Sequence, residues 1–251
     1  MTLLLEVEDL TIHFDMIAAA DNLNVAINTG EVVGIIGPNG AGKTTFLNLV
    51  TGYLKPQKGR IMLMGKDIVG LRPHEITAMG VARSFQMPQL FLELTVLENI
   101  LVALATGTGC SLHFWRPLKN KKRINEAHEI LDRLGIDEMH DRLAGEISEG
   151  DRKLLDVAMA FALKPKLLFM DEPTSGVSTE DKFQVMDTLM NVLNQSEVTT
   201  VFIEHDMSVV QRYAKRVLVL SEGKVVADGH PEAILKKETQ SVQGVEIKCS
   251  K

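Results

Sequence analysis

Short apolar runs near both ends of the chain have the length and composition of buried strands. Runs of about four to eight apolar residues, bounded by glycine, proline or charged positions, are typical of strands covered on both faces. The first runs follow one another without a helical pattern between them, which predicts a small antiparallel edge. Later runs alternate with helical periodicity, which predicts a mainly parallel sheet with helices on both faces. Strands are expected at residues 3–8, 23–27, 31–36, 60–64, 81–85, 167–170, 199–203 and 217–220.

The middle of the chain has helical periodicity and no convincing strand pattern. Residues 124–134 place apolar side chains on one helical face, and Gly135 is a typical stop signal. Thr95 and Glu98 have the spacing of a capping box, so a helix is expected from there to about residue 105. Ser148 is expected to cap another helix, which runs to residue 163.

These patterns predict one α/β core that is interrupted by a helical insertion. We expect the core at residues 1–86 and 166–235, a helical subdomain at 87–165, and a polar C-terminal tail at 236–251. Within the core, further helices are expected up to about residue 53, over residues 73–79, and from near residues 179 and 206.

Residues 37–45 read GPNGAGKTT and directly follow the apolar run 31–36. The spacing G-x-x-x-x-G-K-T is that of a phosphate-binding loop between a strand and a helix. The glycines allow a tight turn with positive φ, so that successive backbone N–H groups can point at one anion. Lys43 supplies a mobile positive charge, and Thr44 supplies a hydroxyl for Mg²⁺. The loop therefore predicts binding of a nucleoside triphosphate.

A later apolar run ends in two carboxylates. Residues 167–170 are followed by Asp171 and Glu172, and the carboxyl ends of strands in such a sheet lie beside the phosphate loop. We expect Asp171 to hold Mg²⁺ through water and Glu172 to polarise the attacking water. The alternative, a strand that simply ends in a polar loop, is disfavoured by the phosphate loop earlier in the same α/β pattern.

Composition and charge exclude several classes of protein. The chain has 251 residues, a formal net charge of −6 and no dense basic run, so a nucleic-acid partner is not expected. Its N-terminus lacks the basic start of a signal peptide. No stretch reaches about 18 apolar residues, so no membrane span is expected. Cys110 and Cys249 are far apart and match no metal spacing, which favours a reducing, cytoplasmic setting.

Five further motifs occur in the order and at the spacings of the ATP-binding subunits of ABC transporters, which the chain resembles over about residues 4–235. Phe14 precedes the phosphate loop at the distance of that family's adenine-stacking aromatic residue. Residues 83–86 resemble the Q-loop, 147–151 stand where the LSGGQ signature stands, 175–178 follow as the D-loop does, and 203–206 resemble the switch-histidine segment.

The resemblance implies an ATPase with ATP and Mg²⁺ as cofactors. Glu172, His205 and Gln86 would be catalytic, with His205 contacting the γ-phosphate. Two such chains would bury two ATP molecules head to tail, each lending its signature to the nucleotide of the other.

Taken singly, Phe14 is also compatible with a core position, Gln86 with a surface position and His205 with a position near a helix cap. The implied nucleotide ligands are Phe14, Gly37, Pro38, Asn39, Gly40, Ala41, Gly42, Lys43, Thr44, Thr45, Ser148 and Gly150, and the implied metal ligands are Thr44, Gln86 and Asp171.

The signature is where the chain departs from the family pattern. Of Leu-Ser-Gly-Gly-Gln it keeps only Ser148 and Gly150, while Glu149 and Asp151 add negative charge where a phosphate would bind. Acidic residues in the first turn also stabilise a helix, and Ser148 with Asp151 resembles a capping box. Ser178 stands where the D-loop usually carries aspartate. We therefore expect slower hydrolysis than in a consensus ATPase of this family.

The loop at residues 106–123 and the segment 86–91 resemble the ATPase subunits of branched-chain amino-acid importers and of related urea and amide importers. The ATPases of lipopolysaccharide and phospholipid transporters are close alternatives, and the tail at 236–251 departs from the importer pattern. The resemblance implies integral-membrane permease subunits, a second ATP-binding subunit that is identical or paralogous, and, indirectly, a periplasmic or extracellular solute-binding protein. The chain would lie at the cytoplasmic face of the inner membrane, and residues 87–92 would form the groove for a permease helix.

Other classes of function fit less well. ABC proteins of DNA repair or translation usually carry two nucleotide cores or a long coiled-coil insertion, and neither pattern is present. Small-molecule kinases and GTPases share the phosphate loop but should lack the signature and switch-histidine segments. A regulatory module that holds ATP with little hydrolysis is the alternative that Glu149, Asp151 and Ser178 favour.

Overall fold

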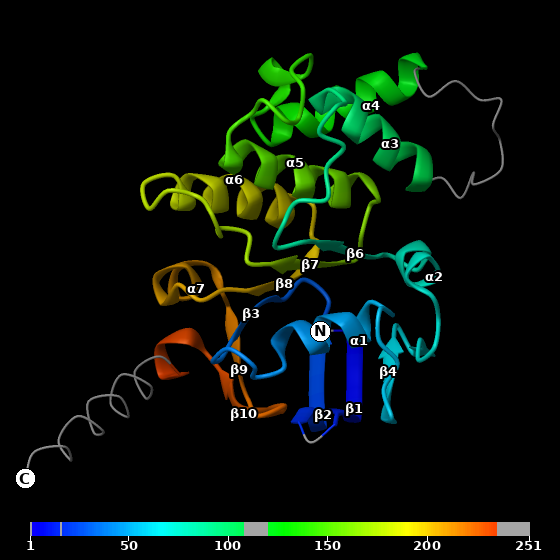
Figure 1. The fold of residues 1–251 in the computed structure, drawn as a ribbon, viewed down its shortest axis with the longest axis vertical. Coiled ribbons are helices and arrows are strands. Elements are labelled where there is room, and N and C mark those ends of the chain that lie inside the picture. Colours follow the sequence, from blue (N-terminus) through cyan, green and yellow to red (C-terminus); the bar gives the residue numbers. More distant parts are fainter. Residues whose placement is uncertain (1, 16, 108–119, 235–251) are drawn as a thin grey trace, which may run out of the picture.

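The computed structural model describes residues 2–15, 17–107 and 120–234 (Figure 1). Its centre is a six-stranded sheet with the order β10-β9-β3-β8-β7-β6. Neighbouring strands from β9 to β6 are parallel, and β10 is antiparallel to β9. The predicted parallel sheet is therefore confirmed, although β10 was not predicted. The strands are β3 (Val32–Ile36), β6 (Val81–Ser84), β7 (Leu167–Asp171), β8 (Thr199–Ile203), β9 (Arg216–Ser221) and β10 (Lys224–Gly229).

A second, four-stranded antiparallel sheet lies along one face of the core, with the order β2-β1-β4-β5. Its strands are β1 (Leu3–Phe14), β2 (Ile17–Asn28), β4 (Lys58–Leu63) and β5 (Lys66–Asp67). The first two are much longer than the predicted segments 3–8 and 23–27. Register shifts interrupt their pairing, and Asp9 and Asn22 have positive φ. These irregularities break the alternation of apolar and polar positions, which is why the pattern underestimates both strands.

Two apolar clusters hold the layers together. One fills the space between the two sheets around α1 (Lys43–Val50), where Phe46 packs edge-on against Phe169 at 6.4 Å between ring centroids. The other lies on the opposite face of the six-stranded sheet, under the helices that follow β7 and β8 and under the helical insertion. All residues of β3, β7 and β8 are buried, as expected for strands covered on both faces. The other core helices are α2 (Pro73–Ala78), α6 (Lys182–Gln195) and α7 (Met207–Tyr213).

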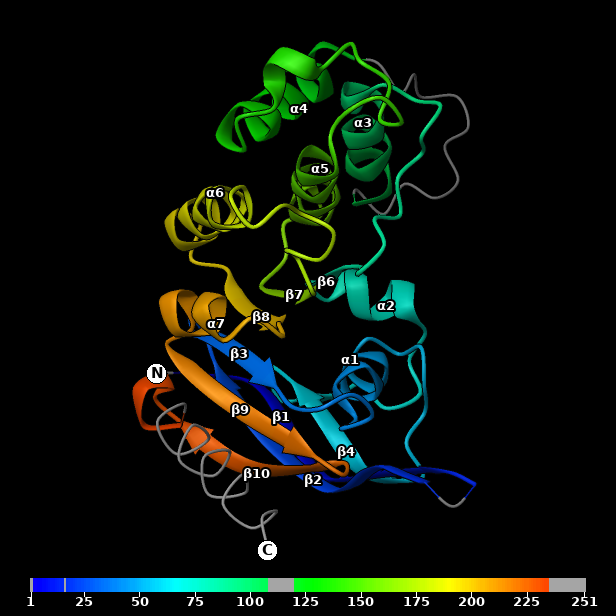
Figure 2. The ribbon, with the colours of Figure 1, turned by 60° about the vertical axis from the view of Figure 1, so that its left-hand side comes forward.

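The described part of residues 87–164 contains helices joined by loops, with an isolated β-bridge between Thr95 and Leu143. In Figure 2, α3 and α4 lie at the end of the molecule farthest from the antiparallel sheet, with α5 between them and the core. The capping box at the start of α3 is confirmed, since Thr95 Oγ1 accepts from Glu98 N and Glu98 Oε2 accepts from Thr95 N, both at 3.1 Å. These elements are α3 (Val96–Gly107), α4 (Lys121–Arg133), the 3₁₀ helix η1 (Asp137–Met139) and α5 (Glu149–Ala162).

Some predictions concern residues beyond the described ranges, including Cys110, most of the loop at 106–123 and the tail at 236–251. Helix α4 begins three residues before the predicted start at Ile124, because Asn120 caps it by accepting from Arg123 N at 2.9 Å. Among the described residues, no helix combines the length and the apolar character needed to cross a bilayer.

Candidate active site

Four neighbouring strands bring the predicted site residues to one edge of the central sheet. The order β3-β8-β7-β6 is parallel throughout, so these strands end on the same side. The loop of residues 37–45 follows β3, His205 follows β8, Asp171 and Glu172 lie at the end of β7, and Gln86 follows β6. Residues separated by more than a hundred positions thus converge because of strand order alone.

The glycines of the loop are required by its own packing. Gly37 has φ 150° and Gly42 has φ 98°, which non-glycine residues rarely adopt. A Cβ atom would lie 2.1 Å from the carbonyl oxygen of Leu220 at the first position and 2.2 Å from that of Ala19 at the second. The loop therefore keeps its shape only with glycine at these two positions.

Helix α1 begins inside this loop and leaves its first turn open. Gly42 is its N-cap, no side chain caps it, and its first turn contains no acidic residue. The free N–H groups and the helix dipole therefore favour an anion at this end. A pocket of about 180 Å³ lies there, lined by Ala19, Asn39, Gly40, Ala41, Gly42, Lys43, Thr44, Thr45, Glu172 and His205.

Lys43 lies against the floor of the pocket. Its ammonium donates to the carbonyl oxygens of Gly37 at 2.6 Å and Pro38 at 2.9 Å, and only 7% of the residue is exposed. Burial lowers the pKa of Lys43, while the nearby carboxylates of Glu172 and Asp171 act in the opposite direction. A buried ammonium next to free N–H groups gives this pocket the chemistry of a phosphate site.

Three of the predicted residues meet directly at Glu172. Gln86 Nε2 donates to Glu172 Oε2 at 2.6 Å, and His205 Nε2 lies 2.9 Å from Glu172 Oε1. Because a carboxylate only accepts, the imidazole is assigned its proton on Nε2. Glu172 also has φ 50°, in the left-handed region that non-glycine residues avoid. Two side chains therefore orient this carboxylate beside the pocket that Lys43 also lines.

Asp171 has a partner that the sequence analysis did not identify. Arg83 Nη2 donates to Asp171 Oδ2 at 2.7 Å, and Arg83 Nη1 donates to Asn48 Oδ1 at 2.6 Å. Both side chains of the ion pair are less than a tenth exposed. The guanidinium thus joins β6, β7 and α1, and it leaves one oxygen of Asp171 for other ligands.

Two charged residues on the buried side of α5 hold the segment around Gln86. The Lys153 ammonium donates to the Gln86 carbonyl oxygen and to Ser175 Oγ. One turn later, the Asp156 carboxylate accepts from Phe85 N at 3.0 Å and from Gln89 N at 3.2 Å. Burial raises the pKa of Asp156 to about 6. The signal in the sequence was a pair of charges on the apolar face of a helix, which indicated burial without naming the partners.

Another buried carboxylate supports the segment that follows Glu172. Glu204 Oε1 accepts from Thr174 N at 3.0 Å and from Thr174 Oγ1 at 2.7 Å, and Glu204 is 4% exposed. Burial raises its pKa. This contact ties the residues after β7 to the end of β8, and so fixes the distance between Glu172 and His205.

The signature residues lie at the start of α5, outside the pocket around Lys43. Ser148 caps the helix by accepting from Asp151 N at 3.1 Å, and its hydroxyl donates to Asp151 Oδ2 at 2.6 Å. In a capping box the carboxylate would accept from the serine backbone N–H. Here it accepts from the serine hydroxyl instead. A Cβ atom on Gly150 would meet only ordinary contacts, the nearest at 3.4 Å from Val185. The packing of the described chain thus gives no reason for glycine at this position.

Two other predicted features are also placed by the structure. Phe14 lies at the end of the β1–β2 hairpin, is 46% exposed and is not among the described residues that line the pocket. Ser178 repeats the arrangement of the signature serine, because its hydroxyl donates to Asp181 Oδ2 at 2.7 Å and accepts from Asp181 N at 3.1 Å.

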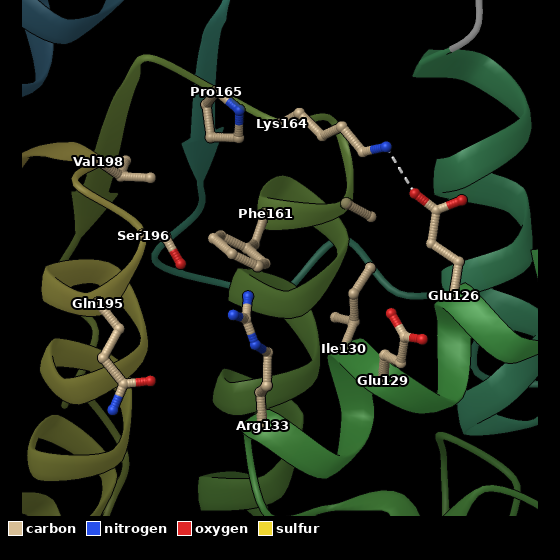
Figure 3. A pocket seen from close by; sticks show the side chains of 11 residues that line it. Glu126, Glu129, Ile130, Arg133, Phe161, Lys164, Pro165, Gln195, Ser196 and Val198 are labelled. Carbon is tan, nitrogen blue, oxygen red and sulfur yellow. Dashed lines mark ion pairs between the residues drawn. The ribbon is translucent and has the colours of Figure 1, made fainter.

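A larger hollow of about 590 Å³ lies elsewhere, between α4 and the C-terminal ends of α5 and α6 (Figure 3). Its walls carry mixed charges, and Lys164 and Glu126 pair across it at 2.6 Å. It contains none of the predicted site residues and no glycine-rich loop. The smaller pocket at the strand ends is therefore the candidate active site.

Comparisons with known proteins agree with this geometry. A family model for ABC transporters matches residues 20–175. The chain is 36% identical over 255 residues to the probable branched-chain amino acid transport ATP-binding protein LivG of Archaeoglobus fulgidus, and the match covers 98% of each protein.

Solved structures of similar proteins include nucleotide complexes. One is the ADP conformation of an ATP-binding cassette of an ABC transporter, with a TM-score of 0.83, 32% identity and full coverage of both chains. Another is a dimeric ATP-binding cassette bound to ADP and phosphate, with a TM-score of 0.77 and 25% identity over 90% of this chain and 98% of that one. The chain therefore belongs to the ABC transporter family, as an ATP-binding subunit with ATPase activity.

Proposed function

We propose that Glu172 is the catalytic base of ATP hydrolysis in this subunit. The observation that carries the proposal is the contact of its carboxylate with Gln86 at 2.6 Å and His205 at 2.9 Å, in a pocket that also contains Lys43. A water held by this carboxylate would lose a proton to it as its oxygen bonds to the γ-phosphorus and the bond to ADP breaks. His205 would then contact the γ-phosphate.

The phosphates would bind to the loop and to the first turn of α1. The backbone N–H groups of residues 37–45 supply donors, and Lys43 would exchange the carbonyls of Gly37 and Pro38 for phosphate oxygens. Phe14, half exposed at the end of its hairpin, would stack on the adenine. This arrangement assigns affinity for the nucleotide chiefly to the N-terminal third of the chain.

The residues beside the pocket fit a magnesium ion. Thr44 offers a hydroxyl, and Gln86 donates through Nε2, which leaves its amide oxygen as a ligand. Asp171 keeps one carboxylate oxygen apart from Arg83 and would act through water. All three donors are oxygens, which Mg²⁺ prefers. When bound, the ion would neutralise charge on the β- and γ-phosphates.

A second subunit, identical or paralogous, would complete the site. Among the described residues nothing packs so closely on Gly150 that glycine is required there, and Ser148 lies at the exposed start of a 14-residue helix. Both facts fit a surface that receives the γ-phosphate of a facing subunit. The similar cassette with ADP and phosphate is a dimer, which supports the pairing of two subunits. The helical subdomain at residues 87–165 would carry this surface.

The chain would power a transporter through separate membrane subunits at the cytoplasmic face of the membrane. Met87 is 78% exposed and Leu92 52%, and both line a hollow of about 500 Å³. Phe91, in the same segment, is 51% exposed. Leu90 is only partly buried, so the predicted groove at residues 87–92 retains its basis. Its occupant would be the end of a permease helix. The name of the Archaeoglobus relative points to branched-chain amino acids as the solute. A binding protein would deliver the solute to the permease.

Substitution of the base tests the catalytic proposal. Glu172→Gln should bind ATP with unchanged affinity, lose about 10²-fold to 10⁴-fold in phosphate release, and accumulate as an ATP-bound dimer in gel filtration. Glu232→Gln, which replaces an exposed glutamate outside the pocket, is the matched control. Turnover at the wild-type rate would refute the role of Glu172, and a strictly monomeric variant would refute the shared site.

The solute is tested separately in proteoliposomes that contain the subunit with its permeases and binding protein. Leucine, isoleucine or valine should stimulate phosphate release and accumulate inside, whereas urea or a short amide should not. Stimulation by the amide alone would reassign the solute without affecting the catalytic proposal.

A further inference from the structure

A cluster of two histidines and a carboxylate lies at the corner between α4 and η1, outside the nucleotide site. His128 comes from α4, Asp137 from η1, and His140 follows η1 directly. One ligand atom from each of these three residues lies within 4.8 Å of the other two. His128 Nδ1 is 2.6 Å from Asp137 Oδ1, and the two imidazole rings face edge-on with 5.0 Å between centroids.

One ring nitrogen of His140 is held by the backbone, and the other lies beside the exposed carboxylate of Asp141. Its Nδ1 lies 2.8 Å from the backbone carbonyl oxygen of Asp137, and a carbonyl can only accept, so Nδ1 carries a proton. Histidines that bind metals are oriented in this way, with one N–H donated to a carbonyl and the other nitrogen on the metal. His140 Nε2 lies 3.1 Å from Asp141 Oδ2. Two such acceptor atoms approach closely only when a proton or a cation lies between them.

The backbone keeps these side chains together. His140 N donates to the Asp137 carbonyl at 3.0 Å, and the His140 carbonyl accepts from Leu97 N, in the first turn of α3, at 3.0 Å. On the other side of the corner, Leu131 and Ile136 are fully or almost fully buried. The three possible ligands are half-buried. Binding would therefore require small side-chain rotations and no rearrangement of the backbone.

We propose that His128, Asp137 and His140 form a binding site for a divalent transition metal of the zinc type. Imidazole with carboxylate is the ligand set of Zn²⁺, Co²⁺ and Ni²⁺, whereas Mg²⁺ and Ca²⁺ prefer oxygen ligands alone. Tetrahedral Zn²⁺ with bonds of about 2.0–2.1 Å places its ligands about 3.3 Å apart. The present ligand atoms all lie within 4.8 Å of one another, and His128 Nδ1 and Asp137 Oδ1, now 2.6 Å apart, would separate slightly on binding. Asp141 or water supplies the fourth ligand.

The metal would join α4 to the segment that leads into the signature. Residues 141–147 connect His140 to Ser148, the cap of α5. The backbone of this segment also pairs with the start of α3, through Val96 N and the Arg142 carbonyl at 2.9 Å. A bound ion therefore braces the helical region without touching the nucleotide pocket.

Tag-free, chelator-treated protein without nucleotide provides the test. CoCl₂ should give the visible absorption of a tetrahedral Co²⁺ site at one equivalent, and ZnCl₂ should abolish it. ZnCl₂ should also raise the melting temperature. His128→Ala and His140→Ala should each weaken Co²⁺ affinity at least tenfold. His74→Ala and His230→Ala remove exposed histidines elsewhere and should change neither signal.

The Asp137→Asn variant distinguishes a metal-binding role of this cluster from a purely structural role. Its amide retains hydrogen bonding at His128 but loses the charge, so this variant should melt normally without metal and bind Co²⁺ at least tenfold more weakly. The proposal is refuted if wild-type protein shows no tetrahedral Co²⁺ spectrum, or if the His128 and His140 variants bind Co²⁺ as the wild type does.

Discussion

The N-termini of helices α1 and α5 are both expected to bind phosphate, but they differ in their caps and in the charge of their first turns. At α1 the cap is Gly42, which provides no side-chain cap for the described first turn, and that turn contains no acidic residue. At α5 the cap is Ser148, which already accepts from Asp151 N, and both Glu149 and Asp151 lie in the first turn. One helix end is therefore open to an anion, and the other is satisfied by its own side chains.

The glycines differ in the same way. The chain's own packing requires Gly42, where a Cβ atom would approach the Ala19 carbonyl oxygen to 2.2 Å. Gly150 could carry a Cβ atom with ordinary contacts. The packing of one subunit thus explains the glycine at the start of α1. The glycine at the start of α5 is explained only if another subunit faces it. We infer that affinity for ATP depends on α1 and that the rate of hydrolysis depends on α5.

The largest effect should come from Lys43→Ala. This variant removes the buried ammonium from the open helix end, so ATP affinity should fall at least about 100-fold, as expected when a charge-assisted contact to phosphate is lost. Titration with a fluorescent ATP analogue measures it. Lys66→Ala removes an exposed lysine of β5 and serves as the control. Unchanged binding in Lys43→Ala would show that α1 does not hold the phosphates.

Ser148→Ala should affect turnover while leaving binding intact. The isolated subunit should keep its ATP affinity, because the serine lies outside the α1 pocket. Phosphate release by the assembled transporter should fall more than about tenfold, in line with the loss of one oriented donor at the reacting phosphate.

The loss of a helix cap destabilises a protein by about 1 kcal/mol, so a stability control is needed. Thr95→Ala removes an equivalent cap, at α3, away from the nucleotide pocket. If both variants lose the same fraction of activity, the effect of Ser148 is structural and the comparison between α1 and α5 fails.

Asp151→Asn should raise the rate. Ser148 now donates its hydroxyl to Asp151 Oδ2 at 2.6 Å, and an incoming γ-phosphate would compete with that carboxylate. Removing the charge should increase phosphate release by the full complex about threefold to tenfold, since exposed charges contribute roughly 1 kcal/mol. Asp151→Glu keeps the charge and should not accelerate hydrolysis. A wild-type complex that already turns over at about 10² per second or faster would contradict the expected slow hydrolysis.

Some residues of the site could be predicted from the sequence, and their distant partners could not. The phosphate loop was predicted from its glycine and lysine spacing, Glu172 from its place at the end of an apolar strand, and His205 from the family resemblance. All three converge because parallel strands end at one edge of the sheet. The partnership of Arg83 with Asp171 spans 88 positions, and that of Asp156 with Phe85 spans 71. A pattern of apolar and polar positions indicates that such a charge is buried but carries no information about its distant partner.

The two strands β1 and β2 were underestimated for a local reason. Bulges shift their register near Asp9 and Asn22, so apolar residues stop alternating although the pairing continues. The cluster at His128, Asp137 and His140 escaped the sequence analysis because its spacing matches no known metal motif. Only the turn between α4 and η1 brings the two histidines together.

The smallest effect concerns the contact between α5 and the segment around Gln86, where Asp156 accepts from Phe85 N and Gln89 N. Burial raises its pKa from 3.8 to about 6, so the native state binds a proton more tightly than the unfolded state. Its contribution to the free energy of unfolding is therefore present at low pH and is lost as pH rises through 6. Between pH 5 and pH 7, the stability of wild type relative to Asp156→Asn should fall by about 1 kcal/mol in urea unfolding. A difference that does not change with pH would mean that this carboxyl stays ionised, and that its two N–H donors outweigh its burial.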